Sequence, residues 1–82
     1  MNYREEIERE FDDLKERLAA RHAIASAAQA TPLDVERALG RSEEASELVR
    51  IFERADYSLH KIGRFDYETF IKAKERAEQR AG

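Results

Sequence analysis

Apolar residues recur along the first part of the chain at the spacing of an α-helix. The larger ones stand three or four positions apart, at Tyr3, Ile7, Phe11, Leu14 and Leu18. This spacing places them on one face of a helix. The stretch that follows is rich in alanine, the residue with the highest helix propensity, until Pro32 disfavours a helical conformation at its predecessor. The pattern therefore predicts a long first helix over residues 3–29.

The segment after the alanine-rich stretch has the residues of a helix start. Thr31 can cap a helix, Pro32 suits its first position, and Asp34 can accept a hydrogen bond from the cap amide. Gly40 is a natural helix stop. The segment therefore predicts a short second helix over residues 32–39. Its expected apolar residues are Leu33, Val35 and Leu39.

Two more helices are predicted in the second half of the chain. Ser42 is the expected cap of a helix over residues 43–57, and Asp66 is the expected cap of a helix over residues 67–80. The apolar face of the earlier helix comprises Ala45, Leu48, Val49, Phe52 and Ala55. One face of the later helix carries Tyr67, Phe70, Ile71, Lys74 and Ala77. The chain is thus predicted to be all-α, a small bundle of four helices that forms one domain over residues 1–82.

Composition supports a folded helical chain and limits its chemistry. Hydrophobic residues make up 41% and charged residues 40% of the sequence, while the net charge is only −3, which argues against disorder. The absence of cysteine excludes disulfides and thiolate sites. No apolar run reaches the roughly 20 residues that span a bilayer, so we expect no direct membrane insertion of this segment.

Candidate catalytic and metal sites were sought among the polar residues, and none is predicted. His22 and His60 are the only histidines, and no HExxH spacing accompanies them. His22 is instead expected at the edge of the first helix's apolar stripe. The acids fall on the polar faces of helices, where nothing raises the proton affinity of one carboxylate above another's. We therefore expect a chain that is not an enzyme, with no catalytic residue, cofactor or metal.

Nucleic-acid binding is the alternative function that the sequence leaves open. The segment over residues 31–42 resembles a helix-turn-helix, with a helix, a glycine turn and a second helix opened by serine. Two observations argue against it. Glu43, Glu44 and Glu47 would face phosphates with negative charge, and Glu36 stands where that motif needs a small residue. A small DNA-binding regulator is kept as the alternative.

The chain from Thr31 onward also resembles a known family. Its Thr31-Pro32 start, the helix after it, and the sequence Glu53-Arg54-Ala55-Asp56-Tyr57-Ser58 are similar to an uncharacterised C-terminal domain of prokaryotic transglutaminase-like and related membrane proteins. One departure is Asp56, where a basic residue commonly precedes the tyrosine. The resemblance implies a cytoplasmic helical domain of a membrane-anchored protein, without a catalytic residue of its own.

These expectations lead to a non-catalytic interaction or accessory domain. Its partner would be a protein or a neighbouring domain of the parent, and a homodimer through the first helix is a further possibility because the stripe has heptad-like spacing. Tyr57, Ser58 and His60 form the candidate interaction patch. The competing interpretation is structural: Tyr57 packs its ring on the core, and Ser58 and His60 satisfy the open end of the third helix.

Overall fold

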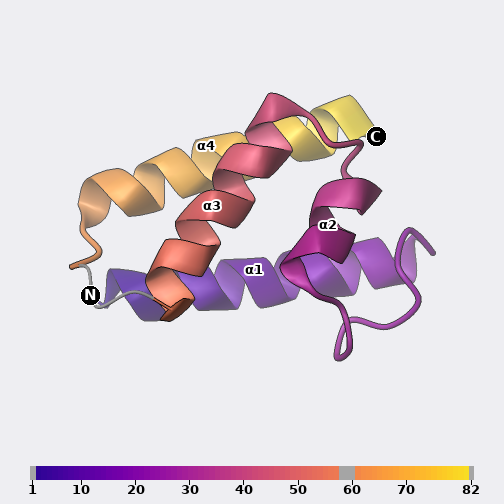
Figure 1. The fold of residues 1–82 in the computed structure, drawn as a ribbon, viewed down its shortest axis with the longest axis horizontal. Coiled ribbons are helices and arrows are strands. Elements are labelled where there is room, and N and C mark those ends of the chain that lie inside the picture. Colours follow the sequence, from indigo (N-terminus) through magenta and orange to yellow (C-terminus); the bar gives the residue numbers. More distant parts are fainter. Residues whose placement is uncertain (1, 58–60, 82) are drawn as a thin grey trace.

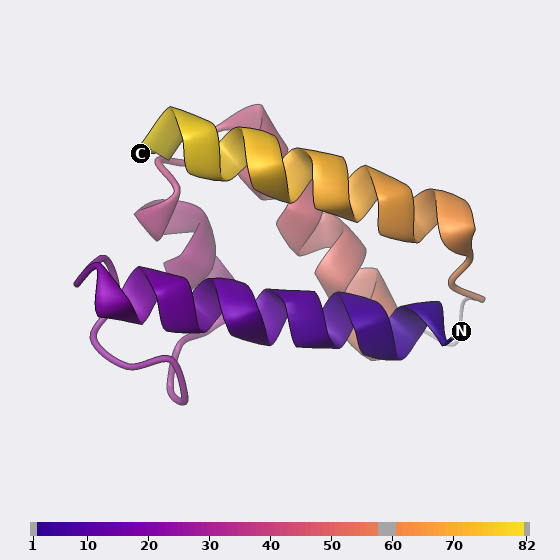
Figure 2. The same ribbon diagram turned by 180° about the vertical axis from the view of Figure 1, so that it is seen from behind.

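The computed structural model describes residues 2–57 and 61–81, and this part of the chain forms a four-helix, all-α fold, as the sequence predicts. Helix α1 spans Tyr3–Ala20, α2 spans Pro32–Ala38, α3 spans Glu43–Tyr57 and α4 spans Arg64–Ala81. Helices α1 and α4 begin at the same end of the molecule and run in the same direction (Figure 1). Seen from behind, they form one layer, with α2 and α3 in a second layer (Figure 2).

The core lies between these two layers and contains most of the predicted stripe residues, together with Ile51 and Ala73, which no predicted face included. Ile7, Phe11, Leu14 and Leu18 on α1 are each at most 2% exposed. The rings of Phe11 and Phe52 stack with centroids 3.8 Å apart, which joins α1 to α3. The remaining buried residues are Val35, Leu39, Ala45, Leu48, Val49, Ile51, Ala55, Phe70, Ala73 and Ala77. Burying this apolar surface is the main force that holds the helices together.

Helix α1 ends at Ala20, so the prediction of a helix to residue 29 is wrong (Figure 1). The end is a Schellman motif, in which the amide of His22 donates to the carbonyl of Ala19 and the amide of Ala23 donates to the carbonyl of Leu18. His22 takes the left-handed conformation that this motif requires, with φ of 61°. It is exposed and lies outside the helix, so its expected place at the edge of the stripe is wrong too.

The alanine-rich segment is not helical, although the helix propensity of alanine alone predicts a helix there. Most helical stability in proteins comes from packing an apolar face, and this segment has few bulky side chains to pack. Ile24 is its one large aliphatic side chain, and it is partly buried against the core. Residues 21–31 therefore cross to α2 as turns and bends.

The predicted starts of α2 and α3 are confirmed, and α2 ends at Ala38, one residue before the predicted end. Thr31 and Asp34 form a complete capping box at the start of α2. Gly40 has φ of +81° just after α2, a conformation that glycine adopts without a steric penalty. The hydroxyl of Ser42 accepts a hydrogen bond from the Ala45 amide at 3.1 Å, so it caps α3 as expected.

Helix α4 begins at Arg64, before the predicted start at residue 67. Asp66 was expected as the cap preceding the helix, but it lies within the first turn. There its carboxylate accepts a hydrogen bond from the Gly63 amide at 3.1 Å. Asp66 therefore satisfies an amide at the N-terminal end of α4 although it lies within the helix. The earlier start places Phe65 on the helix, where it is 80% exposed.

Candidate functional site

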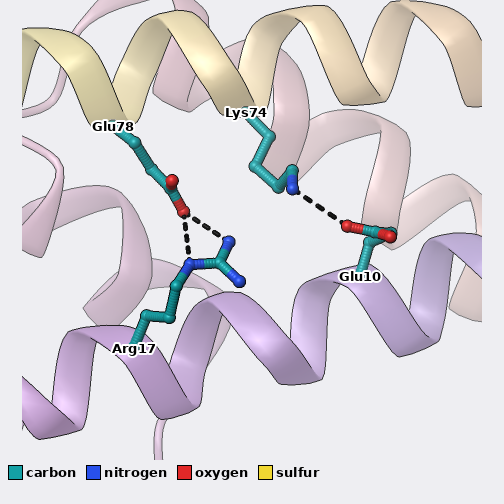
Figure 3. Close-up of polar contacts among 4 residues, drawn as sticks. All are labelled: Glu10, Arg17, Lys74 and Glu78. Carbon is teal, nitrogen blue, oxygen red and sulfur yellow. Dashed lines mark hydrogen bonds and ion pairs between the residues drawn. The ribbon is translucent and has the colours of Figure 1, made fainter.

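A polar seam of two ion pairs joins α1 to α4 (Figure 3). Lys74 Nζ lies 2.9 Å from a carboxylate oxygen of Glu10. Arg17 donates from Nε and Nη2 to one oxygen of Glu78, at 3.1 and 2.6 Å. The charges in this seam are paired with one another across helices that are distant in sequence. The seam therefore fixes the position of α4 on α1.

Two contacts between α1 and α4 share one register, whereas the Arg17–Glu78 pair is offset from it by three residues. The rings of Tyr3 and Tyr67 lie 5.7 Å apart, and the Glu10–Lys74 pair has the same sequence separation as these two tyrosines. Tyr3 and Glu10 are one heptad apart on α1, and Tyr67 and Lys74 are one heptad apart on α4, as expected for parallel helices packed side by side. The stripe considered for a homodimer is thus used within the chain, since four of its five residues are buried in the chain's own core.

Tyr57, the candidate interaction residue, ends α3 and is 74% exposed. The competing interpretation, in which its ring packs on the core, is wrong. Tyr57 stands two positions after the buried Ala55. Residues two positions apart in a helix point to nearly opposite sides, so Tyr57 points away from the core. Ser58 and His60, the other two residues of the predicted patch, lie outside the described residues.

Leu33, one of the apolar residues expected on the second helix, joins Tyr57 as an exposed apolar side chain. It is 51% exposed, because α2 buries Val35 and Leu39 and turns Leu33 away from them. Leu33 and Tyr57 line the same shallow groove, of about 370 Å³, between the start of α2 and the end of α3. Pro32 and Val49 complete its apolar lining.

The charged residues at this groove are acidic. Among the described residues that line it, Glu36 and Glu53 are the ones with charged side chains. Glu36 is held in place by α3, because one of its carboxylate oxygens accepts a hydrogen bond from the Ser46 hydroxyl at 2.9 Å. Glu53 is exposed on α3. A groove with a mixed apolar and acidic lining suits an apolar side chain that has basic neighbours. We call this surface, which comprises Leu33, Glu36, Val49, Glu53 and Tyr57, the α2–α3 groove.

The capping box borders the groove through Thr31, and its carboxylate, Asp34, has a lowered pKa. Hydrogen bonds lower the pKa of Asp34 from its ordinary value of 3.8, chiefly the bond from the Thr31 amide and then the bond from the Thr31 side chain. A carboxylate with a lowered pKa in the folded state contributes stability above its unfolded-state pKa. That contribution is lost as the pH falls through the lowered value.

We therefore expect Asp34→Asn to reduce the stability of the domain at neutral pH and to matter less in acid. The free energy of unfolding of both proteins, measured by urea titration from pH 7 to pH 3, should converge as the pH falls below the ordinary value of 3.8. A difference that stayed constant over this range would show that the Asp34 charge does not support the cap.

The described part of the chain lacks two other kinds of feature, a metal-binding cluster and a membrane-spanning helix. No group of three or more histidine, cysteine, aspartate or glutamate residues in it is arranged to hold a metal ion. No described helix combines the length and the apolar character that crossing a membrane requires. His60, one of the two candidate imidazoles, is outside the residues on which the metal search rests.

Comparison with protein-family models, curated proteins and solved structures finds no match to this chain. The resemblance to the C-terminal domain of transglutaminase-like membrane proteins therefore stays a prediction from the sequence.

Proposed function

We propose that this chain is a non-catalytic interaction domain that binds a protein partner through the α2–α3 groove. The observation that carries the proposal is the joint exposure of Leu33 and Tyr57 at one groove, at 51% and 74%. Large apolar side chains on a domain surface are common singly, but a shared apolar surface with a polar edge is typical of a binding site. Tyrosine is also enriched at such sites, because its ring supplies contact area and its hydroxyl stays polar.

The charge of the groove limits the kind of partner. Glu36 and Glu53 flank the apolar side chains, so a bound segment gains most from an apolar residue between lysine or arginine residues. Exposed ion pairs of this kind contribute about 0.2–1 kcal/mol each and mainly set specificity and association rate. The apolar contact with Leu33 and Tyr57 supplies the larger part of the affinity.

The sequence resemblance supports a cellular setting for this interaction. It implies that the chain is the cytoplasmic C-terminal part of a membrane-anchored protein, where the partner would be another protein or a neighbouring domain of the parent. The alternative, a helix-turn-helix-like DNA-binding regulator, has less support because the first turn of α3 carries Glu43 and Glu44. Phosphates would be repelled at the end of the helix that such a regulator inserts into DNA.

A peptide-binding experiment tests the proposal. The probe is a fluorescein-labelled peptide with one leucine between lysine and arginine residues, and its matched control has glutamate in place of each basic residue. Fluorescence anisotropy at low salt should show binding of the basic peptide only. We expect Tyr57→Ala and Leu33→Ala each to weaken binding about tenfold, which corresponds to about 1.4 kcal/mol. Both side chains are largely exposed, so both variants should remain folded.

The outcomes separate the candidate functions. Equal binding of the basic and acidic peptides, or no loss in the two variants, would contradict the proposed groove. Titration with duplex DNA at the same low salt serves as the arm for the alternative. DNA binding that weakens steeply with added salt and is unaffected by Tyr57→Ala would favour the DNA-binding regulator.

A further inference from the structure

The chain itself carries a segment with the chemistry that the α2–α3 groove requires. Phe65, in the first turn of α4, is 80% exposed and is the most exposed large hydrophobic residue among those described. Lys61 and Arg64 precede it, and both are exposed. Asp66, the acid that follows it, already accepts hydrogen bonds from the Gly63 amide and from Arg54. Phe65 is therefore an apolar side chain with basic neighbours.

Arg64 can pair with a second carboxylate while it remains paired with Glu68. It pairs with Glu68 at 2.8 Å, yet its side chain remains 76% exposed. A guanidinium has five N–H donors, and the one hydrogen bond given for Arg64 uses only its Nε. An acidic residue of another molecule can therefore approach the remaining donors.

We propose that the occupant of the α2–α3 groove is a second copy of this chain, bound through Phe65. The proposal rests on the groove being a binding site, as proposed above, and adds the identity of its partner. In the dimer, Phe65 of each copy lies against Leu33 and Tyr57 of the other, and Arg64 faces Glu53. The two contacts are equivalent, which is the arrangement of a two-fold symmetric dimer.

This dimer differs from the one that the heptad-like stripe of the first helix suggested. The stripe is buried in the chain's own core, whereas Leu33, Tyr57 and Phe65 are the described large hydrophobic residues that stay exposed. Two small contacts of this kind form a weak interface. We expect the chain to be largely monomeric at a protein concentration of roughly 10 µM and largely dimeric at roughly 1 mM.

Sedimentation equilibrium of the full chain over this concentration range tests the proposal. The weight-average mass should rise above the 9.5 kDa of one chain as the concentration increases. Phe65→Ala should abolish the rise. Arg64→Glu and Glu53→Arg should each weaken dimerisation about tenfold or more, because each places like charges opposite one another. An equimolar mixture of these two variants should recover the dimer, since both of its contacts again join opposite charges.

Arg9→Glu is the matched control for the charge reversals. Arg9 is 65% exposed and pairs with Glu6 within its own helix, much as Arg64 pairs with Glu68. Its reversal should leave dimerisation unchanged. A chain that stays monomeric at 1 mM, or a dimer that persists in Phe65→Ala, would overturn the inference.

Failure of the dimer can be distinguished from failure of the groove itself. The labelled basic peptide is titrated into the chain at a concentration below dimerisation. A monomeric chain that binds this peptide, and loses it in Tyr57→Ala, would overturn the second copy as partner and keep the proposed function. A monomeric chain that does not bind it would overturn both.

Discussion

Replacing Phe70 with alanine should leave the domain close to unfolding. Phe70 is fully buried on α4, the helix that packs against both α1 and α3. Truncation of a buried phenylalanine costs about 3–5 kcal/mol, through lost transfer energy and the cavity that remains. A domain of 82 residues has a total stability of about 4–12 kcal/mol. Urea unfolding followed by circular dichroism should therefore show a midpoint shifted to much lower denaturant.

Phe65→Ala is the matched control for this prediction. It removes the same side chain from the same helix, at a position that is 80% exposed rather than buried. We expect a change in the free energy of unfolding of no more than about 0.5 kcal/mol. A similar loss of stability in the two variants would show that Phe70 is not in the core as described.

Removing the charge of Lys74 should cost the next largest amount of stability. Its side chain is only 12% exposed and its partner Glu10 is 26% exposed, so Lys74→Met leaves a mostly buried carboxylate without its cation (Figure 3). An unsatisfied group of this kind costs about 1–3 kcal/mol. Methionine keeps the apolar stem of lysine, so the loss reports on the charge and not on packing.

A double-mutant cycle isolates the pair. Glu10→Gln combined with Lys74→Met should recover part of the loss, with a coupling free energy of about 1 kcal/mol or more between the two positions. The control cycle uses the exposed Arg64–Glu68 pair, for which we expect about 0.3–0.5 kcal/mol. Equal coupling in the two cycles would contradict a structural role for the seam.

The helix positions that the sequence predicts well are those where local chemistry and tertiary packing agree. Local chemistry alone defines the start of α2. Thr31 and Asp34 exchange hydrogen bonds there, Pro32 occupies the first helical position, and the structure has all of these features. Lys74 was placed correctly on the inner face of its helix, but its partner Glu10 is distant in sequence. Only the fold brings these two residues together.

The end of α1 could not be predicted because two preferences compete there. The helix propensity of alanine favours a helix over residues 19–30. The segment has too few bulky side chains, however, for packing against the core to stabilise that helix. The residue that takes the left-handed conformation is His22, not the glycine or asparagine that usually indicates such an end. The sequence alone therefore overestimates the length of the helix.

Part of the candidate site was within reach of sequence reasoning. The sequence names Tyr57 as a residue of a candidate interaction patch, and its offset from the stripe that ends at Ala55 could have excluded the core position. The sequence marks Leu33 only as an apolar residue of the second helix, and its distance of two positions from Val35 places it on the other side of a short helix. Phe65 was missed because the predicted helix began after it. The groove itself requires α2 and α3 to meet, which no local pattern specifies.

Amide chemical-shift mapping of the chain with the labelled basic peptide is the most direct test of the α2–α3 groove as a binding site. At a protein concentration below dimerisation, the account predicts shifts that centre on Leu33, Val49 and Tyr57 and that are absent with the acidic control peptide. Shifts that centre on the α1–α4 seam, or that spread evenly over the four helices, would contradict it.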